Sequence, residues 1–145
     1  MLYRIVYISQ SLISDDMLTS ELSSIRSLAT NNNKEKQISG QLIFCHCNFI
    51  QILEGMKDDV LELLSSIKQD SRHCNLQVIF SARIGRRRFS DWTQMELVSY
   101  DKCLENLSLY LEGLAALPYH SYSLEEVDYI FELIEDIHQV RVKGL

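Results

Sequence analysis

Short segments rich in β-branched and aromatic residues alternate with two amphipathic helical segments over the first 98 residues, and this order restricts the fold more than any other feature. The segments that we predict to be strands are residues 2–9, 41–45, 49–53, 76–82 and 91–98. The helices that we predict between them run from a cap at Ser14 to the polar cluster 31–34, and from about Asp58 to Gln69. The order β-α-β-β-α-β-β, with two helices crossing between strands of one sheet, predicts an α+β ferredoxin-like sandwich with a five-stranded mixed sheet.

Each predicted helix carries apolar residues on one face, which we expect to pack on the sheet. These residues are Leu18, Leu22, Ile25, Leu28 and Ala29 in the first helix and Val60, Leu61, Leu64 and Ile67 in the second. Two more amphipathic segments follow, one at about 101–114 and one that begins with a capping box at Ser123 and Glu126. We therefore expect one domain in residues 1–98 and a helical extension in residues 99–145. The two helices of the extension would pack on the other face of the sheet, or dock a partner or a second copy.

Composition and charge exclude several classes of protein. A net charge of −6 argues against broad nucleic-acid binding, and no apolar run approaches the roughly 20 residues that span a bilayer. The N-terminal segment is typical of a strand rather than a signal peptide, so we expect a cytoplasmic protein whose four cysteines are reduced. Metal binding by Cys45, His46 and Cys47 is disfavoured because neighbouring residues on a hairpin point to opposite faces. We interpret the arginine-rich stretch 83–88 as a solvated turn.

Two polar side chains, Tyr7 and Gln51, interrupt strands that are otherwise apolar. Alternate residues of a strand share a face, so Gln51 places an amide between Phe49 and Leu53. If that strand is central, an unpaired amide there costs about 1–3 kcal/mol, and Tyr7 is the obvious partner. A Tyr–Gln pair beside a polar heterocycle is a hydrogen-bond relay that can switch, because the amide both donates and accepts. A second interpretation stays open, in which Gln51 lies on an edge strand and Tyr7 is an ordinary core residue.

Five stretches of the chain carry a recognisable pattern. They are Tyr3-Arg4-Ile5-Val6-Tyr7-Ile8-Ser9, Asn32-Asn33 followed by Ile38-Ser39-Gly40, Phe49-Ile50-Gln51-Ile52-Leu53-Glu54-Gly55, Asp70-Ser71-Arg72-His73 and Arg86-Arg87-Arg88-Phe89-Ser90-Asp91-Trp92. In order and spacing they resemble the BLUF family of flavin-based blue-light sensors, and the Phe-x-Gln-x-Leu-Glu-Gly stretch is the most specific of them. The resemblance covers residues 1–98. It implies a flavin-binding domain of ferredoxin-like fold that holds FAD noncovalently between its first two helices.

The resemblance also implies a role for each matching residue. Tyr7 would give an electron and a proton to the photoexcited flavin. Gln51 would then rearrange its hydrogen bonds between Tyr7 and the flavin, which leaves a red-shifted signalling state that decays in the dark. The residues implied to hold the cofactor are Ile25, Asn32, Asn33, Gln51, Ile67, Asp70, Arg72 and His73. Ser66 stands where the family often has a basic residue that contacts the cofactor.

The predicted fifth strand, with Trp92, Gln94 and Met95, would carry the signal outward. The family usually has Trp-x-Met here, whereas Met95 comes one residue later than that pattern requires. Either a bulge restores the methionine, or Gln94 takes its place as a second amide near Gln51.

No catalytic output domain is expected after residue 98, so we expect a photoreceptor rather than an enzyme, acting through an unidentified downstream protein or as a homo-oligomer. Two rival functions share the fold. One is a ligand-binding regulatory module without flavin, and the other is a small acyl-phosphatase-like hydrolase. The hydrolase is disfavoured because no glycine-rich phosphate loop follows the first strand. The visible absorption of the purified protein distinguishes a flavin protein from both rivals.

Overall fold

The computed structural model describes residues 1–45, 47–88, 129 and 132, and within these it describes only the backbone of residues 26, 29–34 and 45. The chain divides into two compact units, Met1–Leu97 and Val98–Leu145. The predicted fifth strand and, apart from residues 129 and 132, the two predicted helices of the extension lie outside the described residues. The fold is therefore described for the first unit alone.

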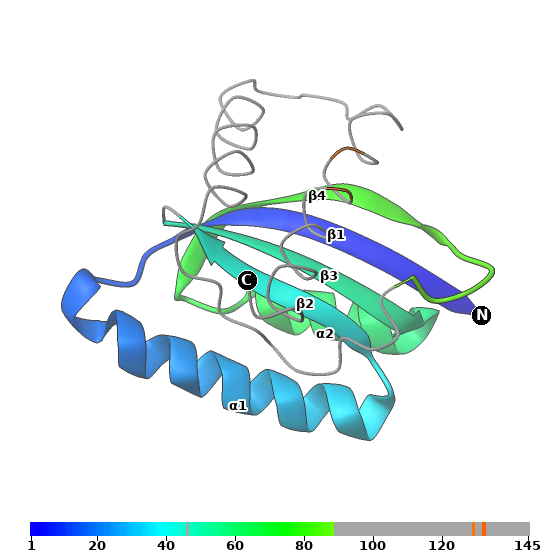
Figure 1. Cartoon of the computed structure of the whole chain (residues 1–145), viewed down its shortest axis with the longest axis horizontal. Coiled ribbons are helices and arrows are strands. Elements are labelled where there is room, and N and C mark those ends of the chain that lie inside the picture. Colours follow the sequence, from blue (N-terminus) through cyan, green and yellow to red (C-terminus); the bar gives the residue numbers. More distant parts are fainter. Residues whose placement is uncertain (46, 89–128, 130–131, 133–145) are drawn as a thin grey trace. The chain divides into compact units, whose positions relative to one another are not determined.

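Four strands form one sheet in the order β2-β3-β1-β4, and every neighbouring pair is antiparallel (Figure 1). They are β1 (Leu2–Ser11), β2 (Ser39–Cys45), β3 (Asn48–Met56) and β4 (His73–Arg83). Each connection through a helix skips one strand, because β3 lies between β1 and β2, and β1 lies between β3 and β4. This is the split crossover of a ferredoxin-like sandwich, so the predicted α+β class is confirmed for the described strands. A mixed sheet would require the predicted fifth strand and stays a prediction.

The two crossover helices are α1 (Leu18–Lys36), which follows a short 3₁₀ turn η1 (Asp15–Met17), and α2 (Lys57–Lys68). The predicted end of the first helix at the asparagine cluster is wrong, because α1 continues to Lys36. Gln37 then adopts a left-handed backbone conformation with φ of 55°, which stops the helix. Ser14 precedes η1 without forming a side-chain cap. Within the described part of the chain, no helix is both long and apolar enough to cross a membrane.

Both helices pack on the same face of the sheet. Val60 and Leu64 of α2 form a buried cluster with residues of the central strands β1 and β3, and Leu22 of α1 forms another with residues of β2 and β3. Full burial of such a side chain contributes about 1.5–3 kcal/mol. Two residues predicted to face the core are instead exposed, Leu28 by 55% and Leu61 by 39%. In α2 the apolar stripe follows helical spacing from Val60 to Leu64, and Leu61 lies about 100° away from it around the helix.

Candidate functional site

Tyr7 and Gln51 stand directly opposite each other on the two central strands, β1 and β3. The Tyr7 hydroxyl donates a hydrogen bond to Gln51 Oε1 at 2.5 Å. The two residues are 3% and 5% exposed. Since β3 has a neighbour on both sides, the alternative in which Gln51 lies on an edge strand is wrong. The pairing of β1 with β4 also shifts register at Tyr7, and such irregularities often re-aim a side chain beside a functional site.

The amide nitrogen of Gln51 is the unsatisfied member of this pair. Its oxygen is taken by Tyr7, and among the described residues no group accepts a hydrogen bond from Nε2. Nε2 is not among the fully buried side-chain atoms that lack a partner in the described part of the chain, so a ligand can still reach it. The position is therefore suited to a ligand that presents a hydrogen-bond acceptor, and the carbonyl oxygens and ring nitrogens of a flavin have this chemistry.

Tyr7 is held in its neutral form. Burial raises the pKa of its phenol, and the negative charge of Asp70 raises the pKa further. A neutral phenol is the form that can donate to Gln51. In the ground state the Tyr7 proton therefore stays on the hydroxyl at any physiological pH.

His73, the first residue of β4, connects three elements around Tyr7. Its Nε2 lies 2.6 Å from the carbonyl oxygen of Ile67, which can only accept, so Nε2 carries the proton. Its Nδ1 lies 2.8 Å from Ser9 Oγ and, in the neutral ring, accepts from that hydroxyl. The ring centroid is 6.3 Å from that of Tyr7 and 6.2 Å from that of Phe49. Both nitrogens of His73 are thus engaged within the protein, which leaves the ring rather than its nitrogens for a ligand.

Asp70 and Arg72 form an ion pair in the turn between α2 and β4. Arg72 Nε and Nη2 lie 2.9 Å and 2.6 Å from the two Asp70 oxygens, and Nη1 lies 3.4 Å from Glu21 of α1. The hydrogen bond from Arg72 holds the pKa of Asp70 below its usual value, and the same bond raises the pKa of Arg72. Arg72 therefore ties α1 to this turn, with its charge opposed by two carboxylates.

The remaining predicted residues divide into three groups. Ile25 and Ile67 are half-buried at the edges of the two core clusters. Asn32 and Asn33 belong to the last turns of α1, and their side chains lie outside the described residues, as do Trp92, Gln94 and Met95. Ser66 is exposed, and its hydroxyl donates to the Glu62 carbonyl oxygen at 3.4 Å.

Sequence reasoning missed a polar network on the other face of the sheet. Arg4 and Glu54 form a buried ion pair, Nε to Oε2 at 2.7 Å. The predicted solvated turn at 83–88 is wrong in part, because Arg87 is half-buried and bonded to β2, to β3 and to Gln37, which lies two residues before β2. The ion pair had a usable signal: the antiparallel register that sets Tyr7 opposite Gln51 also sets Arg4 opposite Glu54. No sequence pattern indicated the contacts of Arg87, because they join segments that are far apart in the sequence and are not paired strands.

A family model described as "BLUF: Sensors of blue-light using FAD" matches residues 2–95. The photoactivated adenylate cyclase subunit beta of Euglena gracilis is 37% identical over 90 residues, which are 61% of this chain and 10% of that protein. The blue light- and temperature-regulated antirepressor BluF of Escherichia coli (strain K12) is 32% identical over 89 residues, 61% of this chain and 22% of that protein. The chain thus matches less than a quarter of the length of either relative.

Two solved structures are similar over nearly the whole chain. "BlsA photo-activated state" superposes with a TM-score of 0.76 at 26% identity and covers 94% of this chain and 95% of its own. "BlrB - a BLUF protein, dark state structure" superposes with a TM-score of 0.70 at 26% identity and covers 92% of this chain and 94% of its own.

Proposed function

The chain belongs to the BLUF family of blue-light sensors that use FAD, and we propose that it binds FAD noncovalently and signals through the hydrogen bonds of Tyr7 and Gln51. One observation carries this proposal. The buried Tyr7 hydroxyl occupies Gln51 Oε1 and leaves Nε2 without an acceptor among the described residues. A flavin acceptor at that position completes the hydrogen bonds of the amide and links the ring to Tyr7 through Gln51.

Residues from both helices, from the turn before β4 and from the first position of β4 would hold the cofactor. Asn33, with Asn32 beside it, would bond the carbonyl edge of the ring from α1. Ile25 and Ile67 would line the ring with apolar surface. Asp70, Arg72 and His73 would border the ring and the ribityl chain. Because both nitrogens of His73 and the charge of Arg72 have partners within the protein, we assign these two residues to shaping the site rather than to neutralising a phosphate.

The light response would begin at the Tyr7 hydroxyl. A bound flavin supplies the absorption of blue light and, once excited, the oxidising power to draw an electron from a nearby phenol. Tyr7, neutral in the ground state, would give its proton together with that electron to the flavin, because oxidation makes a phenol strongly acidic, and both would return to Tyr7 once the Gln51 amide had turned. The hydrogen bond to Gln51 Oε1 would be lost at this step. The Gln51 amide could then turn, so that Oε1 and Nε2 exchange places and the network settles in a second arrangement.

The signal would leave through the predicted fifth strand, at Trp92 and at Gln94 or Met95, and reach a protein partner through the predicted helices of the extension or through a change in a homo-oligomer. The relative named as an antirepressor is a precedent that favours a protein partner. Such an output requires two states of similar free energy that a local change in hydrogen bonding can bias.

The test is the visible absorption spectrum of the purified protein before and after blue light, for the wild type, Tyr7→Phe and Tyr3→Phe. Tyr3 is the matched control, because it lies four residues away on β1 and its hydroxyl contacts Ser81 Oγ at 2.7 Å. We expect flavin bands in all three proteins and a reversible red shift in the wild type and Tyr3→Phe alone. A colourless wild type would contradict flavin binding. A red shift in Tyr7→Phe would contradict the assigned mechanism even with flavin bound.

A further inference from the structure

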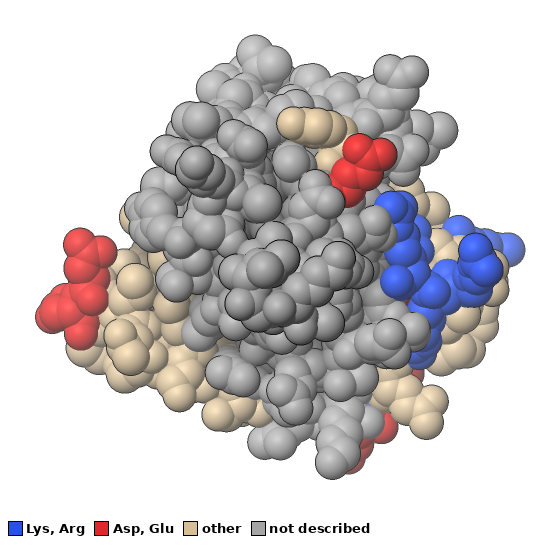
Figure 2. All heavy atoms as spheres, in the orientation of Figure 1, with Lys and Arg blue, Asp and Glu red and all other residues tan. Residues whose placement is uncertain are grey.

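Arg87 joins the segment that follows β4 to the opposite side of the sheet. Its Nη1 donates to Ser39 Oγ at 2.8 Å and to the Glu54 carbonyl oxygen at 2.9 Å, and its Nη2 donates to the Gln37 carbonyl oxygen at 2.7 Å. The acceptors belong to β2, to β3 and to the residue pair before β2, whereas β4 lies at the far edge of the sheet. The chain therefore returns across the end of the sheet before residue 89. Figure 2 shows lysine and arginine side chains gathered at one side of the visible surface.

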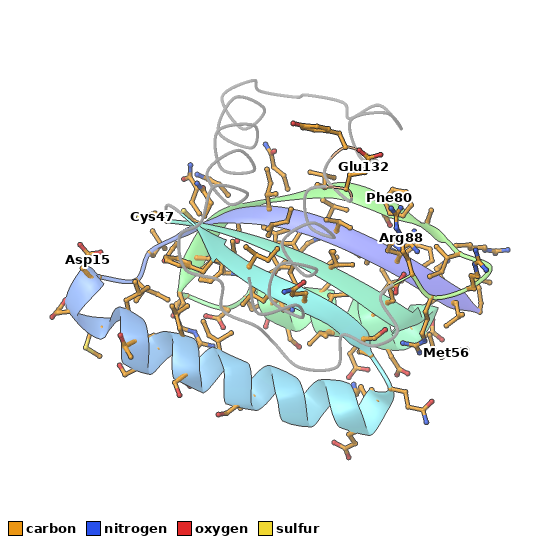
Figure 3. All side chains as sticks on the ribbon, in the orientation of Figure 1. Asp15, Cys47, Met56, Phe80, Arg88 and Glu132 are labelled. Carbon is orange, nitrogen blue, oxygen red and sulfur yellow. The ribbon has the colours of Figure 1, made fainter. Side chains whose placement is uncertain are left out.

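A buried ion pair reinforces this contact. The Glu54 side chain is 0% exposed, and its Oε2 accepts from Arg4 Nε at 2.7 Å and from the backbone N–H of Arg88 at 3.1 Å. Arg88 and Met56, the last residue of β3, are both labelled at this end of the sheet in Figure 3. A buried carboxylate is stable only where cations and donors surround it, so Glu54 fixes its partners in place. Arg87 is thus bonded to the backbone carbonyl of Glu54, and the backbone N–H of Arg88 is bonded to the Glu54 side chain.

The network lies on the strands that carry Tyr7 and Gln51. The pairs Tyr7–Gln51 and Arg4–Glu54 are both directly opposed residues of β1 and β3. They are three positions apart and therefore on opposite faces, separated by roughly 10 Å along the strand. A shift of β3 that begins at Gln51 changes the position of the Glu54 carbonyl oxygen, to which Arg87 is bonded.

We propose, on the basis of the light response proposed above, that Arg87 is a positioning residue that couples β3 to the segment after residue 88. The guanidinium reaches its three acceptors from two nitrogens of one rigid planar group, a span that the single nitrogen of a lysine ammonium does not offer. A change in the Gln51 network moves β3, and Arg87 passes that movement to the chain that leads to Trp92. Arg87 does not touch the Tyr7–Gln51 pair, so its loss leaves the photochemistry intact and interrupts only the transmission.

The experiment uses Trp92, which is the single tryptophan of the chain and lies five residues beyond Arg87. Tryptophan emission and the flavin spectrum are recorded in the dark and after blue light for the full chain, with thermal unfolding measured in parallel. The variants are Arg87→Ala, Arg87→Lys and, as a matched control, Arg86→Ala, which removes an exposed arginine from the same turn.

We expect every variant to keep the flavin red shift. The light-dependent change in tryptophan emission should fall at least about threefold in Arg87→Ala, fall less in Arg87→Lys and stay unchanged in Arg86→Ala. If Arg87→Ala does not fold, the comparison of Arg87→Lys with Arg86→Ala decides the question.

Three outcomes would overturn the proposal. The first is a light-dependent change in tryptophan emission that stays as large as in the wild type in both Arg87 variants. The second is a loss of that change in Arg86→Ala equal to the loss in the Arg87 variants. The third is a lost flavin red shift in Arg87→Lys with unchanged thermal stability, which would place Arg87 in the photochemical site. A wild type without any red shift would overturn the proposed function as well. A wild type that shows the flavin red shift, together with Arg87 variants that keep the full change in tryptophan emission, would overturn this inference alone.

Discussion

Tyr7 is buried within reach of the negative charge of Asp70, and burial and charge both raise the pKa of its phenol. In the unfolded chain the same phenol ionises near its ordinary pKa of 10.0. Above that pH the unfolded state loses a proton that the folded state retains. The free energy of unfolding should therefore fall as pH rises from 10.0 towards the folded pKa, while below 10.0 Tyr7 contributes no pH dependence.

Tyr7→Phe should remove this alkaline loss of stability. The measurement is the free energy of unfolding of the wild type and the variant at about pH 8 and about pH 11, because the difference between the two pH values isolates the titrating group. Asp70→Asn serves as the second variant. Burial raises the pKa of Tyr7 more than the Asp70 charge does, so Asp70→Asn should reduce the alkaline loss of stability without abolishing it. An alkaline loss of equal size in the wild type and Tyr7→Phe would contradict the assignment.

Asp70 should make the free energy of unfolding fall in acid, whereas Tyr7 makes it fall in alkali. The hydrogen bond from Arg72 lowers the pKa of Asp70 below its ordinary value of 3.8. Its contribution to stability is therefore complete above 3.8 and is lost as pH falls from there through the folded pKa. In Asp70→Asn the amide does not titrate, so the stability gap between wild type and variant should narrow as the solution is acidified. A gap that stays constant down to about pH 2 would show that the ion pair adds nothing that depends on protonation.

The fold of the first unit follows largely from local patterns. Period-two and helical spacing placed the four described strands and both helices, and two polar residues on apolar strands made the Tyr7–Gln51 pair one of two open interpretations. The end of α1 did not follow, because a left-handed Gln37 stops the helix instead of the asparagines, and such a conformation has no distinct pattern in the residues themselves.

The side-chain contacts of the site, in contrast, depend on tertiary structure. The partners of Arg87 and of His73 are set by segments that only the completed fold brings together. Local spacing indicates that such a side chain is polar but not which group it meets. The implied roles of Asn32 and Asn33 rest on the resemblance rather than on spacing, and they stay predictions.

Gly40 should be the glycine that tolerates substitution least. It lies on β2 opposite Leu53 with a φ of 153°, and an added Cβ would fall on the carbonyl oxygen of Ile52, a backbone atom that cannot move aside. Gly40→Ala should therefore lower the free energy of unfolding by about 3 kcal/mol or more. Gly85 is the control, because an added Cβ meets nothing within 4 Å there. Gly85→Ala should change stability by no more than about 1 kcal/mol, and equal losses in the two variants would refute the steric argument.

Gln41 and Gln51 should respond in opposite ways to the same substitution. Gln41 lies on β2 opposite Ile52, on the face away from Tyr7, and is 3% exposed. Neither its Nε2 nor its Oε1 has a hydrogen-bond partner in the described part of the protein. Methionine has a similar shape without the unpaired polar atoms, so Gln41→Met should raise the free energy of unfolding by about 1–2 kcal/mol.

Gln51→Met should instead lower the free energy of unfolding by about 1–3 kcal/mol, because it leaves the buried Tyr7 hydroxyl without its acceptor. Denaturant unfolding of the three proteins under one set of conditions checks both signs. A loss of stability in Gln41→Met would show that its amide has a partner, protein or water, beyond the described residues. A gain would identify Gln41 as a buried polar group that destabilises the second face of the sheet, the face on which Arg87 and Glu54 are joined.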